Sequence, residues 1–193
     1  MNPIKTLLAS LAIGTLAASA AMAAAPVELT PMTYDASTSD VTPVKQPGAC
    51  QINIMHLADQ RFGKDGIGAD FPVATSPTDP WVSSGLDSLK AYGFTVQHNG
   101  APIPNAINLD VKLIRAYTWL GHMRINGMVA VDVDMASPAG AKSQKFRATG
   151  SKNNMWNAKT EHVTALNYAF NTMVQKMALS LQSECMQAKL ALR

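Results

Sequence analysis

The longest regular pattern in the chain is an apolar stripe between residues 160 and 189. Apolar side chains recur there every three or four residues, the spacing that places them on one side of an α-helix. They are Val163, Leu166, Phe170, Met173, Met177, Leu181 and Cys185. The opposite side is polar and carries His162, Asn167, Asn171, Gln175, Gln182 and Lys189. The pattern predicts a long helix whose stripe packs on the strands around Val111 and Val131, and whose polar side offers no concentrated chemistry.

Alternating apolar and polar positions in the middle of the chain predict β-strands. Residues 51–58 carry apolar groups on both sides, which is typical of a well-buried strand. Residues 94–97, 109–119, 129–135 and 143–149 also have the pattern of strands. Short turns containing Gly or Pro link the last three, so we expect them to form an antiparallel meander.

A short helix is predicted between the first two strands. Asp79 suits its N-cap, Pro80 its first turn, and Gly93 the left-handed residue that ends it. The side chains expected to face the core are Val82, Leu86, Leu89 and Tyr92. The order of elements indicates an α+β fold, in which a mostly antiparallel sheet carries the long C-terminal helix on one face.

The N-terminal residues divide the chain into three parts. Residues 1–23 resemble a secretory signal peptide, with Lys5 before an apolar run and the small residues Ala21-Met22-Ala23 at its end. Residues 24–49 hold four prolines among Ser, Thr and Asp, which predicts an extended, flexible leader. Residues 50–193 would form a single α+β domain. No apolar segment after the signal is long enough to span a bilayer, so we expect a soluble periplasmic protein, or alternatively a secreted one.

The predicted export determines the redox environment of the two cysteines, Cys50 and Cys185. Both lie in the exported part, and an oxidising compartment favours a disulfide between them. Two buried free thiols are the alternative.

The formal net charge of +3 is nearly balanced, and Lys5 contributes part of it before the signal is removed. The chain has no dense basic tract, so nucleic-acid binding is not expected. The four histidines stand far apart in the sequence, and none forms a close pair of the kind that marks zinc sites. They are His56, His98, His122 and His162. We therefore expect neither a metal nor a cofactor.

Two neighbouring carboxylates, Asp132 and Asp134, share one side of a predicted strand. They could act together in acid–base chemistry. Alternation with cross-strand pairing explains them without chemistry, and the available partners are Lys112, Lys145 and Arg147.

Four large side chains are the best candidates for a binding surface: Tyr117, Trp119, Met155 and Trp156. Aromatic residues are enriched at binding hot spots, and these could line an apolar groove for a lipid or a protein partner. The alternative is that they belong to the core of the meander and of the turn before the long helix.

Several motifs occur in a recognisable order. Asp59-Gln60-Arg61 ends the first predicted strand, and Ile67-Gly68, Trp81 and Gly93-Phe94 follow. This order resembles the YajG-like family of bacterial envelope lipoproteins and, more distantly, auxiliary lipoprotein components of envelope lipid-transport systems. The resemblance implies that Asp59 and Arg61 shape the loop after the first strand, and it implies no catalytic residue.

One departure from that family concerns the membrane anchor. Its members carry a lipid on an N-terminal cysteine, whereas Ala24 follows the predicted cleavage site in this chain. Lipid tethering therefore does not carry over.

The leading functional hypothesis is a non-catalytic periplasmic accessory or binding protein that serves envelope assembly or lipid handling, with an envelope protein or a lipid as its partner. A second hypothesis is a hydrolase with a site in the 59–80 loop, because long loops inside compact domains are often functional. It would use Asp65, Asp70 or His56. A third is a secreted factor that binds a host or competitor protein.

Overall fold

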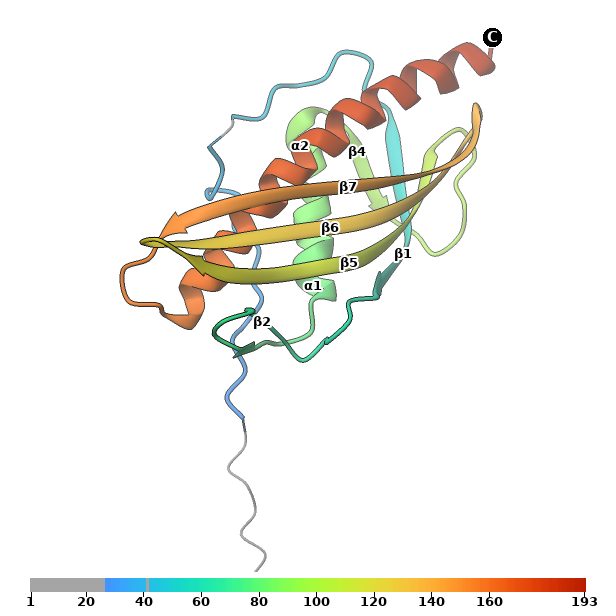
Figure 1. The fold of residues 1–193 in the computed structure, drawn as a ribbon. Helices are drawn as coiled ribbons and strands as arrows, with labels where there is room; N and C mark the ends of the chain where they lie inside the picture. Colours follow the sequence, from blue (N-terminus) through green and yellow to red (C-terminus); the bar gives the residue numbers. More distant parts are fainter. Residues whose placement is uncertain (1–26, 41) are drawn as a thin grey trace, which may run out of the picture.

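A five-stranded mixed sheet organises the molecule (Figure 1). The computed structural model describes residues 27–40 and 42–193, so the predicted signal peptide lies outside the described residues. The strand order is β4 (Thr95–His98), β1 (Gln51–Asp59), β5 (Ile107–Gly121), β6 (Arg124–Ser137) and β7 (Gly140–Asn153). β1 runs parallel to both of its neighbours, whereas β5, β6 and β7 form the expected antiparallel meander. β1 lies inside the sheet and is buried at Ile52 and Ile54, whereas Met55 and Leu57 are only partly buried, so the expected burial on both sides is not reached over its second half.

The α+β class is confirmed by two helices on one face of this sheet, called the inner face below (Figure 1). α1 (Asp79–Asp87) continues into a 3-10 turn, η1 (Ser88–Tyr92), and α2 (Lys159–Ala191) ends the chain. A small two-stranded hairpin, β2 (Gly66–Ile67) with β3 (Val73–Ala74), lies in the loop between β1 and α1. No helix in the described part of the chain is long and apolar enough to cross a membrane.

The capping residues of the short helix differ from the expectation at its N-terminal end only. Thr78 occupies the N-cap position, and Asp79 is already helical. At the other end Gly93 has a φ of 95°, and the Phe94 N–H donates to the Leu89 carbonyl at 3.4 Å. This is the predicted left-handed ending. The four side chains expected in the core, Val82, Leu86, Leu89 and Tyr92, are buried.

All seven residues of the apolar stripe of α2 are buried, mainly over β6 and β7. Two glycines explain how closely the helix approaches the sheet. Gly127 and Gly150 lie opposite each other on β6 and β7. A Cβ atom on Gly127 would lie 2.7 Å from backbone atoms of Ala165, and one on Gly150 would lie 2.3 Å from the backbone nitrogen of Ala169. Only glycine leaves room for the helix backbone at this crossing.

The polar side of α2 is partly covered by other segments of the chain. His162, Asn167 and Asn171 are buried. The Trp81 indole N–H donates to Asn167 Oδ1 at 2.7 Å, and the Asn167 amide donates to the Thr33 carbonyl at 3.0 Å. These side chains are polar because their partners are polar groups of other segments, which the sequence pattern alone does not reveal.

The segment expected as a leader lies along α2. Met32 is buried, and the Asn171 amide donates to the carbonyls of Asp35 at 3.1 Å and Thr38 at 2.9 Å. Further along, the Lys189 ammonium donates to the Gly48 carbonyl at 3.0 Å. Residues 27–40 therefore contribute buried side chains to the domain, and residues 42–49, which are mostly exposed, contact it through hydrogen bonds.

The predicted disulfide between Cys50 and Cys185 is present. It joins residues 135 positions apart, with a Cα–Cα distance of 5.6 Å. It fastens the entrance of β1 to the last turns of α2. Closing so long a loop stabilises the folded chain by about 5 kcal/mol in the chain-entropy model.

The glycine crossing gives a direct test of how α2 packs. We expect Gly150→Ala to lower the free energy of unfolding by about 2–3 kcal/mol, because the added methyl group meets helix backbone that cannot move aside. Gly100→Ala is the matched control, since a Cβ there meets nothing within 4 Å, and it should change stability by less than about 0.5 kcal/mol. Urea unfolding followed by circular dichroism measures both. Equal effects of the two substitutions would contradict this packing.

Candidate functional site

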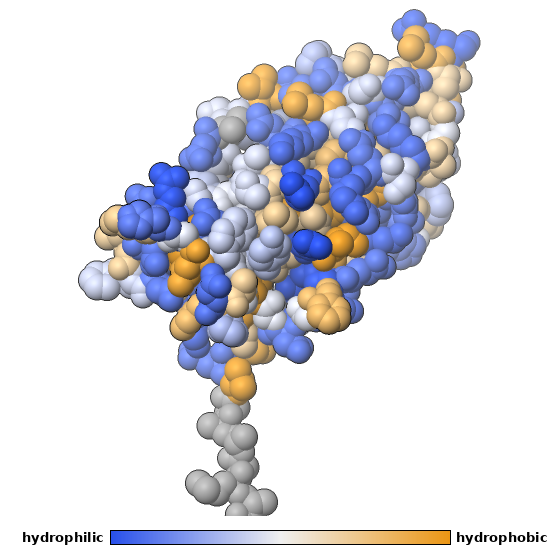
Figure 2. Space-filling model, in the orientation of Figure 1, coloured by the Kyte–Doolittle hydropathy of each residue, from blue (hydrophilic) through white to orange (hydrophobic). Residues whose placement is uncertain are grey.

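The outer face of the sheet, turned away from both helices, presents its side chains in rows set by the strand register. It faces the viewer in Figures 1 and 2, and Figure 2 shows it as mainly hydrophilic with separate apolar spots. The rows differ in character from one end of the sheet to the other, so the face divides into a charge-paired part and a part with unpaired cations.

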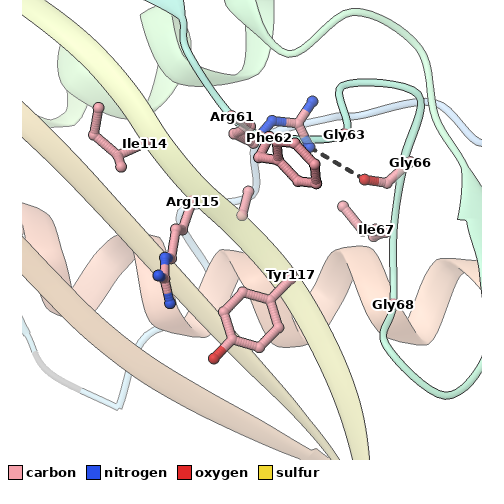
Figure 3. Close-up of a pocket in the computed structure, with 10 residues that line it drawn as sticks. Arg61, Phe62, Gly63, Gly66, Ile67, Gly68, Ile114, Arg115 and Tyr117 are labelled. Atoms are coloured by element: carbon pink, nitrogen blue, oxygen red, sulfur yellow. Dashed lines mark hydrogen bonds between the residues drawn. The ribbon is translucent and has the colours of Figure 1, made fainter.

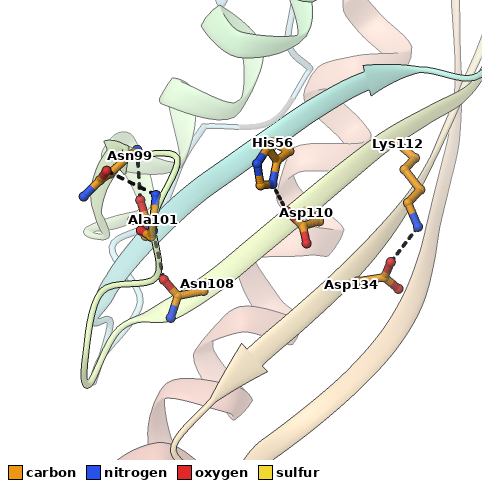
Figure 4. A network of polar contacts seen from close by, with 8 residues as sticks. His56, Asn99, Ala101, Asn108, Asp110, Lys112 and Asp134 are labelled. Atoms are coloured by element: carbon orange, nitrogen blue, oxygen red, sulfur yellow. Dashed lines mark hydrogen bonds and ion pairs between the residues drawn. The ribbon is translucent and has the colours of Figure 1, made fainter.

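The charge-paired part lies near the start of β5 (Figure 4). Lys112 Nζ lies 2.7 Å from Asp134 Oδ2, and Lys145 Nζ lies 3.4 Å from Asp132 Oδ1. The hydrogen bond from Lys112 lowers the pKa of Asp134 below its ordinary value. The two carboxylates that share this strand face are therefore partners of cross-strand lysines, as the pairing alternative predicted.

The next row along the sheet consists of Arg115, Ala130 and Arg147, in register on β5, β6 and β7. Both arginines are exposed, and neither guanidinium has an ion-pair partner among the described residues. Ala130 between them is only 3% exposed, which agrees with long side chains lying over it. Two unpaired cations thus flank one small apolar spot.

Aromatic and apolar groups continue this surface toward the β5–β6 turn. Tyr117 is in register with Met128, and Trp119 with Asn126. The rings of Tyr117 and Trp119 lie 5.5 Å apart, and both side chains are half-buried. The rows of Arg115, Tyr117 and Trp119, with their neighbours on β6 and β7, are called the outer-face site below.

A cleft of about 380 Å³ borders this site, between the loop after β1 and residues 114–117 of β5 (Figure 3). Figure 3 shows Arg115 and Tyr117 side by side on β5, with the loop opposite. Phe62 and Ile67 line the cleft from the loop, and the Phe62 ring is fully exposed. The cleft therefore combines one free cation with apolar and aromatic surface.

The loop that walls the cleft is held by Asp59 and Arg61. Arg61 Nη2 lies 2.8 Å from Asp59 Oδ2 and donates at 3.0 Å to the Lys64 carbonyl, while Nη1 donates at 3.3 Å to the Gly66 carbonyl. Burial alone would raise the pKa of Asp59, but hydrogen bonds from Arg61 and Thr78 outweigh it and hold that pKa below its ordinary value. Arg61 is buried and fully engaged, so it shapes the loop and Arg115 is the cation open to a ligand.

The same loop also covers the edge of β5 beyond the end of β1. The Ala69 N–H donates to the Thr118 carbonyl at 2.7 Å, and the Leu120 N–H donates to Asp70 Oδ2 at 3.2 Å. Asp70 thereby accepts a hydrogen bond from a backbone N–H on the edge of β5 that β1 does not cover. His56 lies on β1, with its Nδ1 2.7 Å from Asp110 Oδ1, and no hydrogen bond in the described structure joins it to Asp65 or Asp70.

The remaining histidines occupy separate surroundings. His98 lies beside Asp87 at 3.3 Å, His122 is in the exposed β5–β6 turn, and buried His162 contacts Thr118 Oγ1 at 2.7 Å. Burial lowers the pKa of His162. Among residues 27–40 and 42–193, no group of three His, Cys, Asp or Glu side chains could hold a metal ion.

The four side chains predicted as a binding surface fall into two places. Tyr117 and Trp119 belong to the outer-face site. Met155 and Trp156 belong instead to the connection between β7 and α2, where both are strongly exposed. Arg115 was not singled out from the sequence, and Arg147 was considered only as a partner for aspartates. The signal that could have found both is cross-strand register, which requires the pairing of three strands.

Glu161 fixes the connection that carries Met155 and Trp156. Its carboxylate accepts from Lys152 Nζ at 2.8 Å and from the backbone N–H groups of Met155, Trp156 and Ala158 at 3.2, 3.2 and 3.0 Å. The Lys152 hydrogen bond, together with these backbone donors, lowers the pKa of Glu161 to about 2. The two exposed apolar side chains are thus presented by a well-ordered backbone.

Comparison with solved structures finds one with a TM-score above 0.5. A protein from Xanthomonas campestris assigned to DUF330 has a TM-score of 0.51 and 11% identity, over 85% of this chain and 98% of that chain. An uncharacterized protein has a TM-score of 0.49 with 12% identity over 79% and 99%, and a minor lipoprotein from Acinetobacter baumannii has 0.39 with 10% over 67% and 92%. No family model and no curated protein sequence matches the chain. The chain is thus an α+β protein that shares its fold with the Xanthomonas protein.

The Glu161 network predicts a pH-dependent contribution to stability. Because the pKa of Glu161 in the folded protein lies below its ordinary value of 4.5, its stabilisation is present above about pH 4.5 and is lost as the pH falls toward about 2. Glu161→Gln should therefore unfold at lower urea concentration than the wild type at pH 7, and the difference should narrow between pH 4.5 and 2. Glu28→Gln, at an exposed carboxylate, is the control and should have no such effect. A Glu161→Gln deficit that stays constant across this range would contradict the network.

Proposed function

We propose that this protein is an exported, non-catalytic accessory protein of the bacterial envelope that binds an anionic amphiphile, such as a phospholipid, at the outer-face site. The observation that carries the proposal is the pair of unpaired arginines, Arg115 and Arg147, beside a half-buried aromatic pair.

The chemistry of this row suits a phosphate group. A guanidinium is planar and always charged, and it binds phosphate through two parallel hydrogen bonds. Arg115 and Arg147 are separated by one intervening strand, so a headgroup above Ala130 lies within reach of both. The neighbouring rows then offer Tyr117, Trp119 and Met128 to the apolar part of the ligand, and the cleft beside Phe62 extends that surface.

The side chains of the outer-face site support binding and give little support to catalysis. Its aliphatic hydroxyl groups, at Thr149 and Ser151, have no histidine or carboxylate among their register neighbours to activate them as nucleophiles. The histidine on this face, His56, is engaged by Asp110 in the charge-paired part. The site offers charge and apolar surface, which is what recognition of an amphiphile requires.

Three further observations support a place in the envelope. Residues 1–23 have the features of a secretory signal. The Cys50–Cys185 disulfide is expected of an oxidising compartment. The Asp59-Gln60-Arg61 and Ile67-Gly68 motifs resemble the YajG-like envelope lipoproteins, and here they build the wall of the cleft. We propose that the chain is a divergent relative of that group.

Native mass spectrometry of the protein purified from the periplasm tests the proposal. We expect a bound phospholipid, and we expect the Arg115→Ala/Arg147→Ala double variant to retain at least tenfold less of it, because loss of each charge-assisted contact costs about 1.5–3 kcal/mol. Lys145→Ala is the control, since it removes a cation of the same face that already has an aspartate partner. Absence of bound lipid in the wild type, or equal occupancy in the double variant, would contradict the proposed function.

A further inference from the structure

A second apolar surface lies at the end of the sheet and is separate from the outer-face site. Its residues are Met123, Met155 and Trp156, called the apolar tip below, with exposed fractions of 73%, 65% and 85%. Met123 lies in the β5–β6 turn, and the other two lie in the connection between β7 and α2. Figure 1 shows both connections at the same end of the molecule. A hydrogen bond from the Asn154 N–H to the Met123 carbonyl, at 2.9 Å, joins them.

The exposure of the apolar tip is imposed by the structure. Glu161 holds the backbone of Met155 and Trp156, as described above. The Asn157 N–H donates to Asn154 Oδ1 at 2.8 Å, and Asn157 Oδ1 lies 3.1 Å from Nε2 of buried His162. Both turns are therefore anchored to the domain. Keeping large apolar side chains in water is unfavourable, on the order of 25 cal/mol per Å², so a fixed and exposed tryptophan indicates a surface that is covered when the protein works.

We propose that the apolar tip inserts into the interfacial layer of an anionic lipid bilayer. Tryptophan is the residue type enriched at the membrane–water interface, and methionine adapts to irregular apolar surroundings. Arg124, next to Met123, is exposed and has no ion-pair partner in the described part of the chain, whereas exposed Lys159, beyond Trp156, lies 3.6 Å from the Glu28 carboxylate. Cations beside inserted apolar groups match the charge of an anionic headgroup layer.

Size distinguishes a membrane from a protein partner. A stable protein–protein interface buries about 800 Å² on each partner. Three side chains on two turns provide much less than this area, whereas interfacial insertion requires only a small apolar surface together with electrostatic attraction. The apolar tip is also separate from Arg115 and Arg147, so this inference goes beyond the proposed ligand and does not rest on it.

Vesicle co-sedimentation of the processed protein tests the inference. The probes are vesicles of phosphatidylcholine with 30% phosphatidylglycerol, compared with pure phosphatidylcholine. We expect the wild type to sediment with the anionic vesicles, and Trp156→Glu and Met155→Glu each to weaken binding at least tenfold. Arg124→Gln should weaken it about fivefold, the equivalent of about 1 kcal/mol for one cation near an anionic surface. Leu179→Glu, at an exposed leucine on α2, is the matched control and should bind as the wild type does.

Other outcomes would overturn the inference. They are a wild type that sediments with neither vesicle, a Trp156→Glu variant that binds undiminished, and a Trp156-dependent dimer in sedimentation velocity without vesicle binding, which would assign the apolar tip to a second copy of the chain. The Arg115→Ala/Arg147→Ala double variant should keep its vesicle binding. A failure of the outer-face site and a failure of the apolar tip can therefore be told apart.

Discussion

The structure depends on the close contact between α2 and the sheet at Gly127 and Gly150. Because the helix backbone rests directly on β6 and β7 there, its apolar stripe fills the inner face, and the Cys50–Cys185 disulfide secures its far end to β1. The polar side of the helix forms hydrogen bonds with the N-terminal segment. The inner face of the sheet is thus buried by helix packing, and the outer face is the one open to a ligand.

The sequence predicted what local patterns determine. The stripe of α2 and the meander follow from periods of 3.6 and 2, and Gly93 marked the end of the short helix. The burial of Asn167 and Asn171 could not be predicted, because their partners lie more than 80 positions away. Tyr117 and Trp119 were recognised by residue type. Arg115 was missed because strict alternation from Leu109, Val111 and Leu113 would place it on the inner face, and only the register irregularity between Leu113 and Arg115 turns it to the outer face.

The two proposed surfaces rely on different physical interactions. The outer-face site offers paired guanidinium groups beside a shallow aromatic strip, which suits one amphiphilic molecule. The apolar tip offers a few projecting side chains beside cations, which suits a bilayer surface. The Asp59–Arg61 pair holds the loop that walls the cleft beside the outer-face site, and Glu161 holds the backbone that carries the apolar tip. Rigid presentation lowers the entropic cost of binding.

The most direct test of the central claim is a backbone NMR titration of the processed protein with dodecyl phosphate below its micelle concentration. Binding at the outer-face site predicts saturable shifts confined to residues 115–119, 126–130 and 147–151 and to the neighbouring loop at 61–68, with α2 unaffected, and no response to dodecyltrimethylammonium at the same concentration. Shifts confined to α2, or equal responses to the anionic and cationic amphiphiles, would contradict it.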